Sequence, residues 1–143
     1  MNAEYIFWPV LAQVFLTLVM FGLLGVRKAR NIKAGLVDRR KAALDTKAWP
    51  EDVVKVSNNI ANQFEVPVLF YVLCLVAWSL DAVSGLMLIL ASVFALSRYV
   101  HAWVHVGSNY VPMRLRLFLV GFLMVLLMLV LLVWHLATGL IGA

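Results

Sequence analysis

Charged side chains are scarce in this chain. They make up 13% of its 143 residues, and only 7 of them are acidic. So little charge excludes two soluble domains joined by a linker. The single cysteine, Cys74, excludes an internal disulfide, and we expect it to be a small packing or lipid-facing residue. Short tracts of alternating apolar and polar residues are also missing, which excludes a transmembrane barrel.

Long apolar runs dominate instead, since 64% of the residues are hydrophobic. Four runs occupy residues 6–26, 64–80, 83–104 and 115–136. Each can cross a hydrocarbon core of about 30 Å as a helix, and a helix satisfies its own backbone groups in lipid. The sequence therefore predicts an all-α integral membrane protein. We expect one domain over residues 1–143, a four-transmembrane-helix bundle whose solvent is the lipid bilayer.

Basic residues gather between the first two runs and at the start of the fourth: Arg27, Lys28, Arg30, Lys33, Arg39, Arg40, Lys41, Lys47 and Lys55, then Arg114 and Arg116. By the positive-inside rule both connections face the cytoplasm, so both termini are expected to be extracytoplasmic. No platform of interleaved aromatic residues accompanies these charges, so we expect no nucleic-acid partner.

The second span has a distinctive start. Pro50 suits the first position of a helix, and Glu51 and Asp52 suit its positive end. A helix over residues 50–80 would be about 46 Å long, so its first turns must project beyond the membrane or run obliquely. Pro67 removes a backbone donor inside it, which predicts a kink close to Glu65. Short turns at 81–84 and 107–112 make the later spans antiparallel neighbours.

Two groups of polar side chains interrupt the second and third spans. On the second span one face carries Asn58, Asn62 and Glu65, with Asn59 and Gln63 as a neighbouring row. On the third span, helical spacing aligns Arg98, His101 and His105. Because the two spans run in opposite directions, these faces are expected to lie at the same depth.

Ionisable groups inside a membrane are costly unless they pair, face a wet cavity or bind a ligand. We therefore expect Glu65 and Arg98 to contact each other or the same ligand. A structural ion pair with a hydrogen-bonded seam between the helices is the alternative. His101 and His105 could hold a metal, but no third ligand stands at a suitable spacing, and we predict none.

The segment from Asn58 to Phe70, NNIANQFEVPVLF, resembles the helix-two signature of the MAPEG family, the membrane-associated proteins in eicosanoid and glutathione metabolism. The core of that signature is an Asn-x-x-Glu pair, here Asn62 and Glu65. The Arg98-Tyr99-Val100-His101 segment and the basic start of the fourth run resemble the third and fourth helices of the family. The likeness is to its poorly characterised bacterial branch, which implies a bacterial inner membrane.

The resemblance implies a homotrimer that holds glutathione between neighbouring subunits near the cytoplasmic face. In the motifs, Asn62 and Glu65 match a glutathione-contacting pair, and Arg98 and Tyr99 match an Arg-Tyr pair on the third helix. Arg114 matches an arginine beside the thiol. The chain departs from the transferase pattern at three places: Asn58 replaces an arginine, Val66 an aromatic residue and Trp103 a tyrosine.

The resemblance predicts a glutathione-dependent transferase or peroxidase acting on lipophilic electrophiles. A guanidinium, from Arg114 or Arg98, would lower the pKa of the thiol, and the thiolate would attack the electrophile. Asn58, Asn62, Glu65 and Tyr99 would orient the tripeptide. The alternative is a non-catalytic membrane scaffold or a small proton-coupled transporter using Glu65, although inverted repeats are not visible.

Overall fold

The computed structural model describes residues 2–141, and this part of the chain is helical, with no strand. A 3-10 turn, Ala3–Ile6, leads into α1, and a second one, Thr46–Ala48, precedes α3. The α-helices are α1 (Phe7–Lys33), α2 (Arg39–Ala42), α3 (Glu51–Gln63), α4 (Val66–Ser79), α5 (Gly85–Val106) and α6 (Val111–Ile141). Four segments are long and apolar enough to cross a membrane: Ala3–Lys33, Glu51–Ser79, Gly85–Val106 and Val111–Gly139. The four-span prediction is confirmed.

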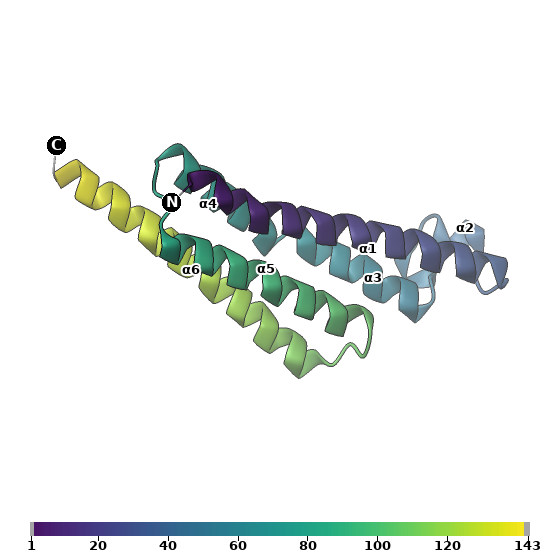
Figure 1. Cartoon of the computed structure of the whole chain (residues 1–143). Helices are drawn as coiled ribbons and strands as arrows, with labels where there is room; N and C mark the ends of the chain where they lie inside the picture. The colour runs from purple at the N-terminus through teal and green to yellow at the C-terminus, as the bar shows by residue number, and fades with distance from the viewer. Residues whose placement is uncertain (1, 142–143) are drawn as a thin grey trace.

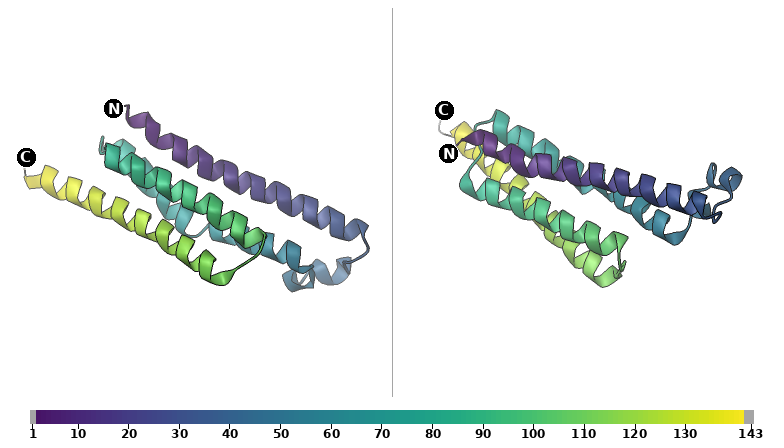
Figure 2. Two further views of the ribbon diagram at one scale, coloured as in Figure 1. Left: turned by 60° about the horizontal axis from the view of Figure 1, so that its bottom comes forward. Right: turned by 45° about the vertical axis from the view of Figure 1, so that its right-hand side comes forward.

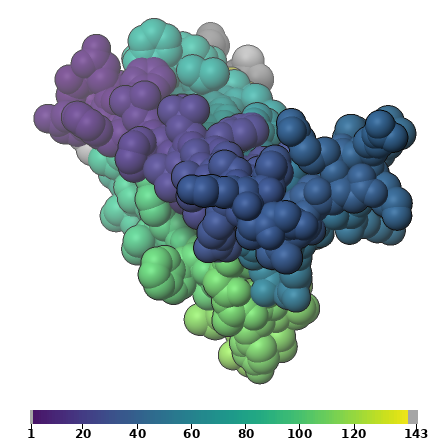
Figure 3. Space-filling model, turned by 90° about the vertical axis from the view of Figure 1, so that its right-hand side faces the viewer, coloured from purple at the N-terminus to yellow at the C-terminus, as the bar shows by residue number. Residues whose placement is uncertain are grey.

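The spans alternate in direction (Figures 1 and 2). Both ends of the chain and the turn at residues 80–84 lie at one end of the bundle. The connection between α1 and α3, residues 34–50, and the α5–α6 turn, residues 107–110, lie toward the other, which we call the basic end. Figure 3 looks onto the basic end, where the blue residues of the α1–α3 connection stand out to one side. The expected antiparallel order of the spans is present.

The apolar core has two clusters, a larger one mainly between α4, α5 and α6 and a smaller one between α1, α3 and α5. Phe70 of α4 stacks on Phe94 of α5 with ring centroids 4.3 Å apart, and Cys74 is buried in the same cluster. Gly121 lets α6 approach closely, since a Cβ there would lie 3.2 Å from the Ser97 hydroxyl. Most other apolar side chains point outward, as expected for helices whose solvent is lipid.

The second span is two helices, which corrects the predicted single helix over residues 50–80. The helix α3 ends at Gln63, α4 begins at Val66, and Glu65 between them has φ −101° and ψ −106°. Pro67 lies in the first turn of α4, where its missing N–H costs nothing, but it cannot donate to the Gln63 carbonyl. The expected kink is therefore a break of the helix.

Candidate functional site

The break between α3 and α4 opens onto a cavity of about 370 Å³. Its polar lining combines side chains from the break, from α5 and from the start of α6: Asn62, Glu65, His101 and Arg114. Its apolar lining comes from Val111, Leu115 and Phe118 of α6. The structure thus brings together three residues predicted for the site, Asn62, Glu65 and Arg114, and adds His101.

Arg98 does not line this cavity and is 1% exposed. Its Nη2 donates to the backbone carbonyl of Asn62 at 3.1 Å. That carbonyl belongs to the last turn of α3, where the helix itself provides no donor. Arg98 therefore caps the broken helix and helps to fix the position of Asn62.

The direct ion pair expected between Glu65 and Arg98 is not formed. Within residues 2–141 the ion pairs are Arg30–Asp52, Lys41–Asp38 and Lys55–Glu51. The physical reason is the break: Glu65 leaves the helical face and is exposed at the surface of the subunit. Contact through a shared ligand, the other expected arrangement, stays a prediction.

Three buried nitrogen atoms near the cavity have no hydrogen-bond partner within the described part of the chain. They are Arg98 Nε, His101 Nδ1 and Arg114 Nε. Arg114 is held by its other end, where Nη1 donates to Asn109 Oδ1 at 2.7 Å. His101 is 3% exposed, and its ring meets that of His105 edge-on at 5.6 Å. An unpaired buried polar group typically costs about 1–3 kcal/mol, so these atoms call for a polar ligand or water.

Three residues predicted to contact the cofactor, Arg98, Tyr99 and Asn58, do not line this cavity. The Tyr99 hydroxyl donates to the Ala12 carbonyl on α1 at 2.7 Å. One residue along a helix turns the side chain by about 100°, so Tyr99 faces away from the side that Arg98 occupies. Asn58 is exposed one turn before Asn62, and its carbonyl accepts from the Asn62 amide at 2.9 Å.

The second polar row, rather than the row containing Asn58, is the one inside the subunit. Gln13 Nε2 donates to Gln63 Oε1 at 2.7 Å, and Gln63 Nε2 donates to Asn59 Oδ1 at 3.1 Å. The Asn59 amide nitrogen lies 3.3 Å from His105 Nδ1. We call these four residues the buried polar chain. It joins α1, α3 and α5, as expected for a hydrogen-bonded seam, and Gln13 was not anticipated although it is a lone amide in an apolar run.

An arginine of α1 fixes the spans at the basic end. Arg27 Nη1 donates to the Asp52 carbonyl at 2.6 Å, and its Nη2 donates to the Val106 carbonyl at 3.1 Å. The Asp52 carboxylate accepts from Arg30 at 2.6 Å and from Asn31 at 3.2 Å. These contacts tie α1 to the start of α3 and to the end of α5, the helix that carries Arg98 and His101.

The comparison with family models matches residues 5–134 to the MAPEG family. This chain belongs to the MAPEG family. No curated protein and no solved structure matches it. The family includes glutathione transferases and peroxidases, and the present MAPEG protein is a membrane protein of this family. Its Asn-x-x-Glu pair, Asn62 and Glu65, stands at the break between α3 and α4, where both residues reach the cavity.

Proposed function

We propose that this MAPEG protein binds glutathione at the cavity beside the α3–α4 break and uses it to attack lipophilic electrophiles, as a transferase or peroxidase. The observation that carries the proposal is the set of three buried, unpartnered nitrogens, Arg98 Nε, His101 Nδ1 and Arg114 Nε. His101 and Arg114 line one cavity with the exposed Glu65, and Arg98 contacts the carbonyl of Asn62 in the same lining. These nitrogens can form hydrogen bonds with a ligand, because they form none within residues 2–141.

The chemistry of the lining fits a ligand with two carboxylates, an amine and a thiol. Glu65 is placed to accept from the amine, and the Asn62 side chain offers an amide. Arg114 and Arg98 are cationic partners for a carboxylate or a thiolate. A cavity of about 370 Å³ falls in the range of small-molecule sites, and its apolar wall adjoins lipid-facing α6.

Bound there, glutathione would supply a sulfur nucleophile. Arg114 would hold the thiolate form by placing its guanidinium close to the sulfur, which lowers the pKa of the thiol. The proton would leave to water, and the sulfur electron pair would form the new bond to the electrophile as its leaving group departs. Arg98 would position Asn62 through the carbonyl contact described above, and Asn62 would orient the tripeptide.

The assembly we propose is a homotrimer, with the ligand held between neighbouring subunits. Asn58 and Glu65 are exposed on a span that crosses the membrane, and polar groups that face lipid are costly. A neighbouring subunit would cover them and complete the cavity wall. The basic end would face the cytoplasm of a bacterial inner membrane, with both termini extracytoplasmic. A mass equal to that of one chain, measured both in detergent and in lipid, would refute the proposed trimer.

A scaffold or proton-coupled transporter remains the second candidate, favoured by one observation. Glu65 forms no ion pair within residues 2–141 and sits where the backbone leaves the helix. A membrane carboxylate of this kind can bind and release a proton. In that case Glu65→Gln would abolish proton movement in vesicles, and glutathione would have no effect.

Titration of the lipid-embedded protein with glutathione tests the first proposal. We expect calorimetry to detect binding at millimolar glutathione and ultraviolet absorbance to detect the thiolate. Arg114→Ala should reduce thiolate formation more than binding. The matched control is Arg116→Ala, since Arg116 is exposed on the same turn of α6 and does not line the cavity.

The position of Asn58 offers a gain of function. A charge-assisted hydrogen bond contributes about 1.5–3 kcal/mol, so Asn58→Arg should tighten glutathione binding roughly ten- to a hundredfold. If neither the natural chain nor the Asn58→Arg variant binds glutathione at millimolar concentration, the transferase proposal fails and the second candidate replaces it.

A further inference from the structure

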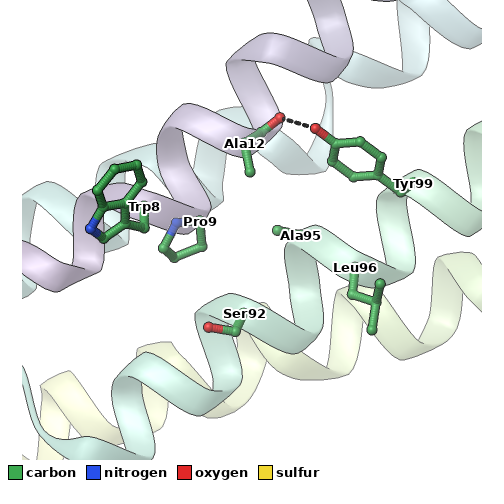
Figure 4. Close-up of a pocket in the computed structure, with 7 residues that line it drawn as sticks. All are labelled: Trp8, Pro9, Ala12, Ser92, Ala95, Leu96 and Tyr99. Atoms are coloured by element: carbon green, nitrogen blue, oxygen red, sulfur yellow. Dashed lines mark hydrogen bonds between the residues drawn. The ribbon is translucent and has the colours of Figure 1, made fainter.

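A groove separate from the candidate site follows the face between α1 and α5. It consists of two cavities, of about 510 Å³ and 530 Å³, which share Tyr99 as a lining residue. Neither shares a residue with the cavity at the α3–α4 break. Figure 4 shows the first one, with Ala12 on α1 and Ala95 on α5 leaving space between the helices, and the Tyr99 hydroxyl bonded across it.

The second cavity continues from Tyr99 toward the basic end. Its lining is apolar except for one charged side chain, Arg27. The apolar walls are formed by Phe15, Leu16, Val19, Met20 and Leu23 of α1 and by Ala102, Trp103 and Val106 of α5. Trp103 is 80% exposed at the rim. Tryptophan at such a level is typical of the membrane interface.

The length of this groove matches one leaflet. From Phe15 to Arg27 the rise along α1 is about 18 Å at 1.5 Å per residue. Half of a hydrocarbon core of about 30 Å is about 15 Å. A lipid chain lying from Phe15 toward Val106 would therefore end with its headgroup at the level of Arg27.

Arg27 forms no ion pair within residues 2–141, although its charge acts on the nearby Asp52 carboxylate. Its two assigned hydrogen bonds go to backbone carbonyls, those of Asp52 and Val106. The Asp52 carboxylate is paired with Arg30 instead, and the ion pairs formed between residues 2 and 141 do not include Arg27. A guanidinium has five N–H donors, so Arg27 keeps donors for an anion while it holds the helices.

We infer that the groove between Tyr99 and Arg27 binds one phospholipid with an anionic headgroup, taken from the leaflet at the basic end. An acyl chain lies along α1 between Phe15 and Leu23. The phosphate, or a second anionic group of the headgroup, contacts Arg27. Charge complementarity and the match to one leaflet favour a lipid over a second copy of the chain. The apolar groove ends at Arg27, a cation at the depth of the membrane interface.

Native mass spectrometry of the full chain in detergent tests the headgroup. The probes are phosphatidylglycerol and phosphatidylcholine with identical acyl chains. Each juxtamembrane cation contributes about 1 kcal/mol of attraction, so phosphatidylglycerol should bind about fivefold more tightly. Arg27→Gln should remove that preference and Arg27→Lys should keep it. Lys28→Gln is the control, since Lys28 lies beside Arg27 but outside the groove.

A second pair of variants tests the place of the acyl chain. Val19→Trp fills the groove from its exposed edge and should weaken both lipids, whereas Leu18→Trp, on a neighbouring exposed position outside the groove, should not. Equal binding of the two lipids by the natural chain would overturn the inference. An equal loss of the phosphatidylglycerol preference in Lys28→Gln and Arg27→Gln would also overturn it. A Val19→Trp variant that still binds both lipids but no longer binds a second copy of the chain would overturn it too.

Discussion

Replacing Gln63 by leucine probes the buried polar chain directly. Gln63 is 1% exposed and makes two side-chain hydrogen bonds, to Gln13 at 2.7 Å and to Asn59 at 3.1 Å. Interhelical hydrogen bonds in membranes contribute about 0.6 kcal/mol on average. Only the bond to Gln13 joins two helices, since Asn59 lies with Gln63 on α3, so this term is about 0.6 kcal/mol. The Gln13 amide, 0% exposed, is also left without its acceptor. We expect Gln63→Leu to lower the free energy of unfolding by about 1–3 kcal/mol.

The double variant separates the hydrogen bond from the loss of packing. Gln13→Leu removes the partner of Gln63, so the combined variant should lose less than the sum of the two single changes, by about 0.6 kcal/mol and at most about 1.7 kcal/mol. Reversible unfolding by SDS in mixed micelles, followed by helical circular dichroism, measures each value. Ser92→Ala is the control, since Ser92 is exposed and bonds only to the Leu88 carbonyl. Additive losses within about 0.3 kcal/mol would refute the coupling.

Three further outcomes are expected. Gly121→Leu should destabilise the α5–α6 contact by about 1–3 kcal/mol, seen as a lower Tm, because even a Cβ there meets Ser97; an unchanged Tm would contradict the close packing. Arg30→Ala should change the free energy of unfolding by less than about 1 kcal/mol, because the Arg30 side chain, which pairs with Asp52, is 69% exposed. Lys41→Cys should react with an impermeant thiol reagent only from the cytoplasmic side, and labelling from the outside would reverse the proposed orientation.

The spans could be predicted because, with lipid as the solvent, the length and apolar composition of a run are enough to identify a membrane-spanning helix. The four apolar runs and the turns between them, such as that at 81–84, follow from that rule alone. The break at Phe64 and Glu65 was predicted only as a kink. Pro67 removes the donor to the Gln63 carbonyl, but how far the backbone unwinds depends on contacts from other helices, such as that of Arg98 with the neighbouring Asn62 carbonyl.

The arrangement of the polar rows could not be read from the sequence. Asn58 and Asn59 are equally polar neighbours, and helical spacing places each in a row. The choice depends on partners far along the chain, since Gln13 lies 50 residues from Gln63 and His105 lies 46 residues from Asn59. Spacing on one helix placed Asn62 and Glu65 on one face, whereas Arg114 was added by the family resemblance; all three line one cavity.

The two hydrogen bonds of Arg27 set an order for membrane insertion. They reach residues 25 and 79 positions later in the chain. At about 5–20 residues per second, a ribosome needs roughly 4–16 s to extend the chain from Arg27 to Val106. During that interval the first helix waits in the bilayer with this arginine hydrated at the interface. Locking of the first, second and third spans is thus a late step of biogenesis, and a nascent chain stalled before the third span would expose α1 to insertion chaperones and membrane proteases.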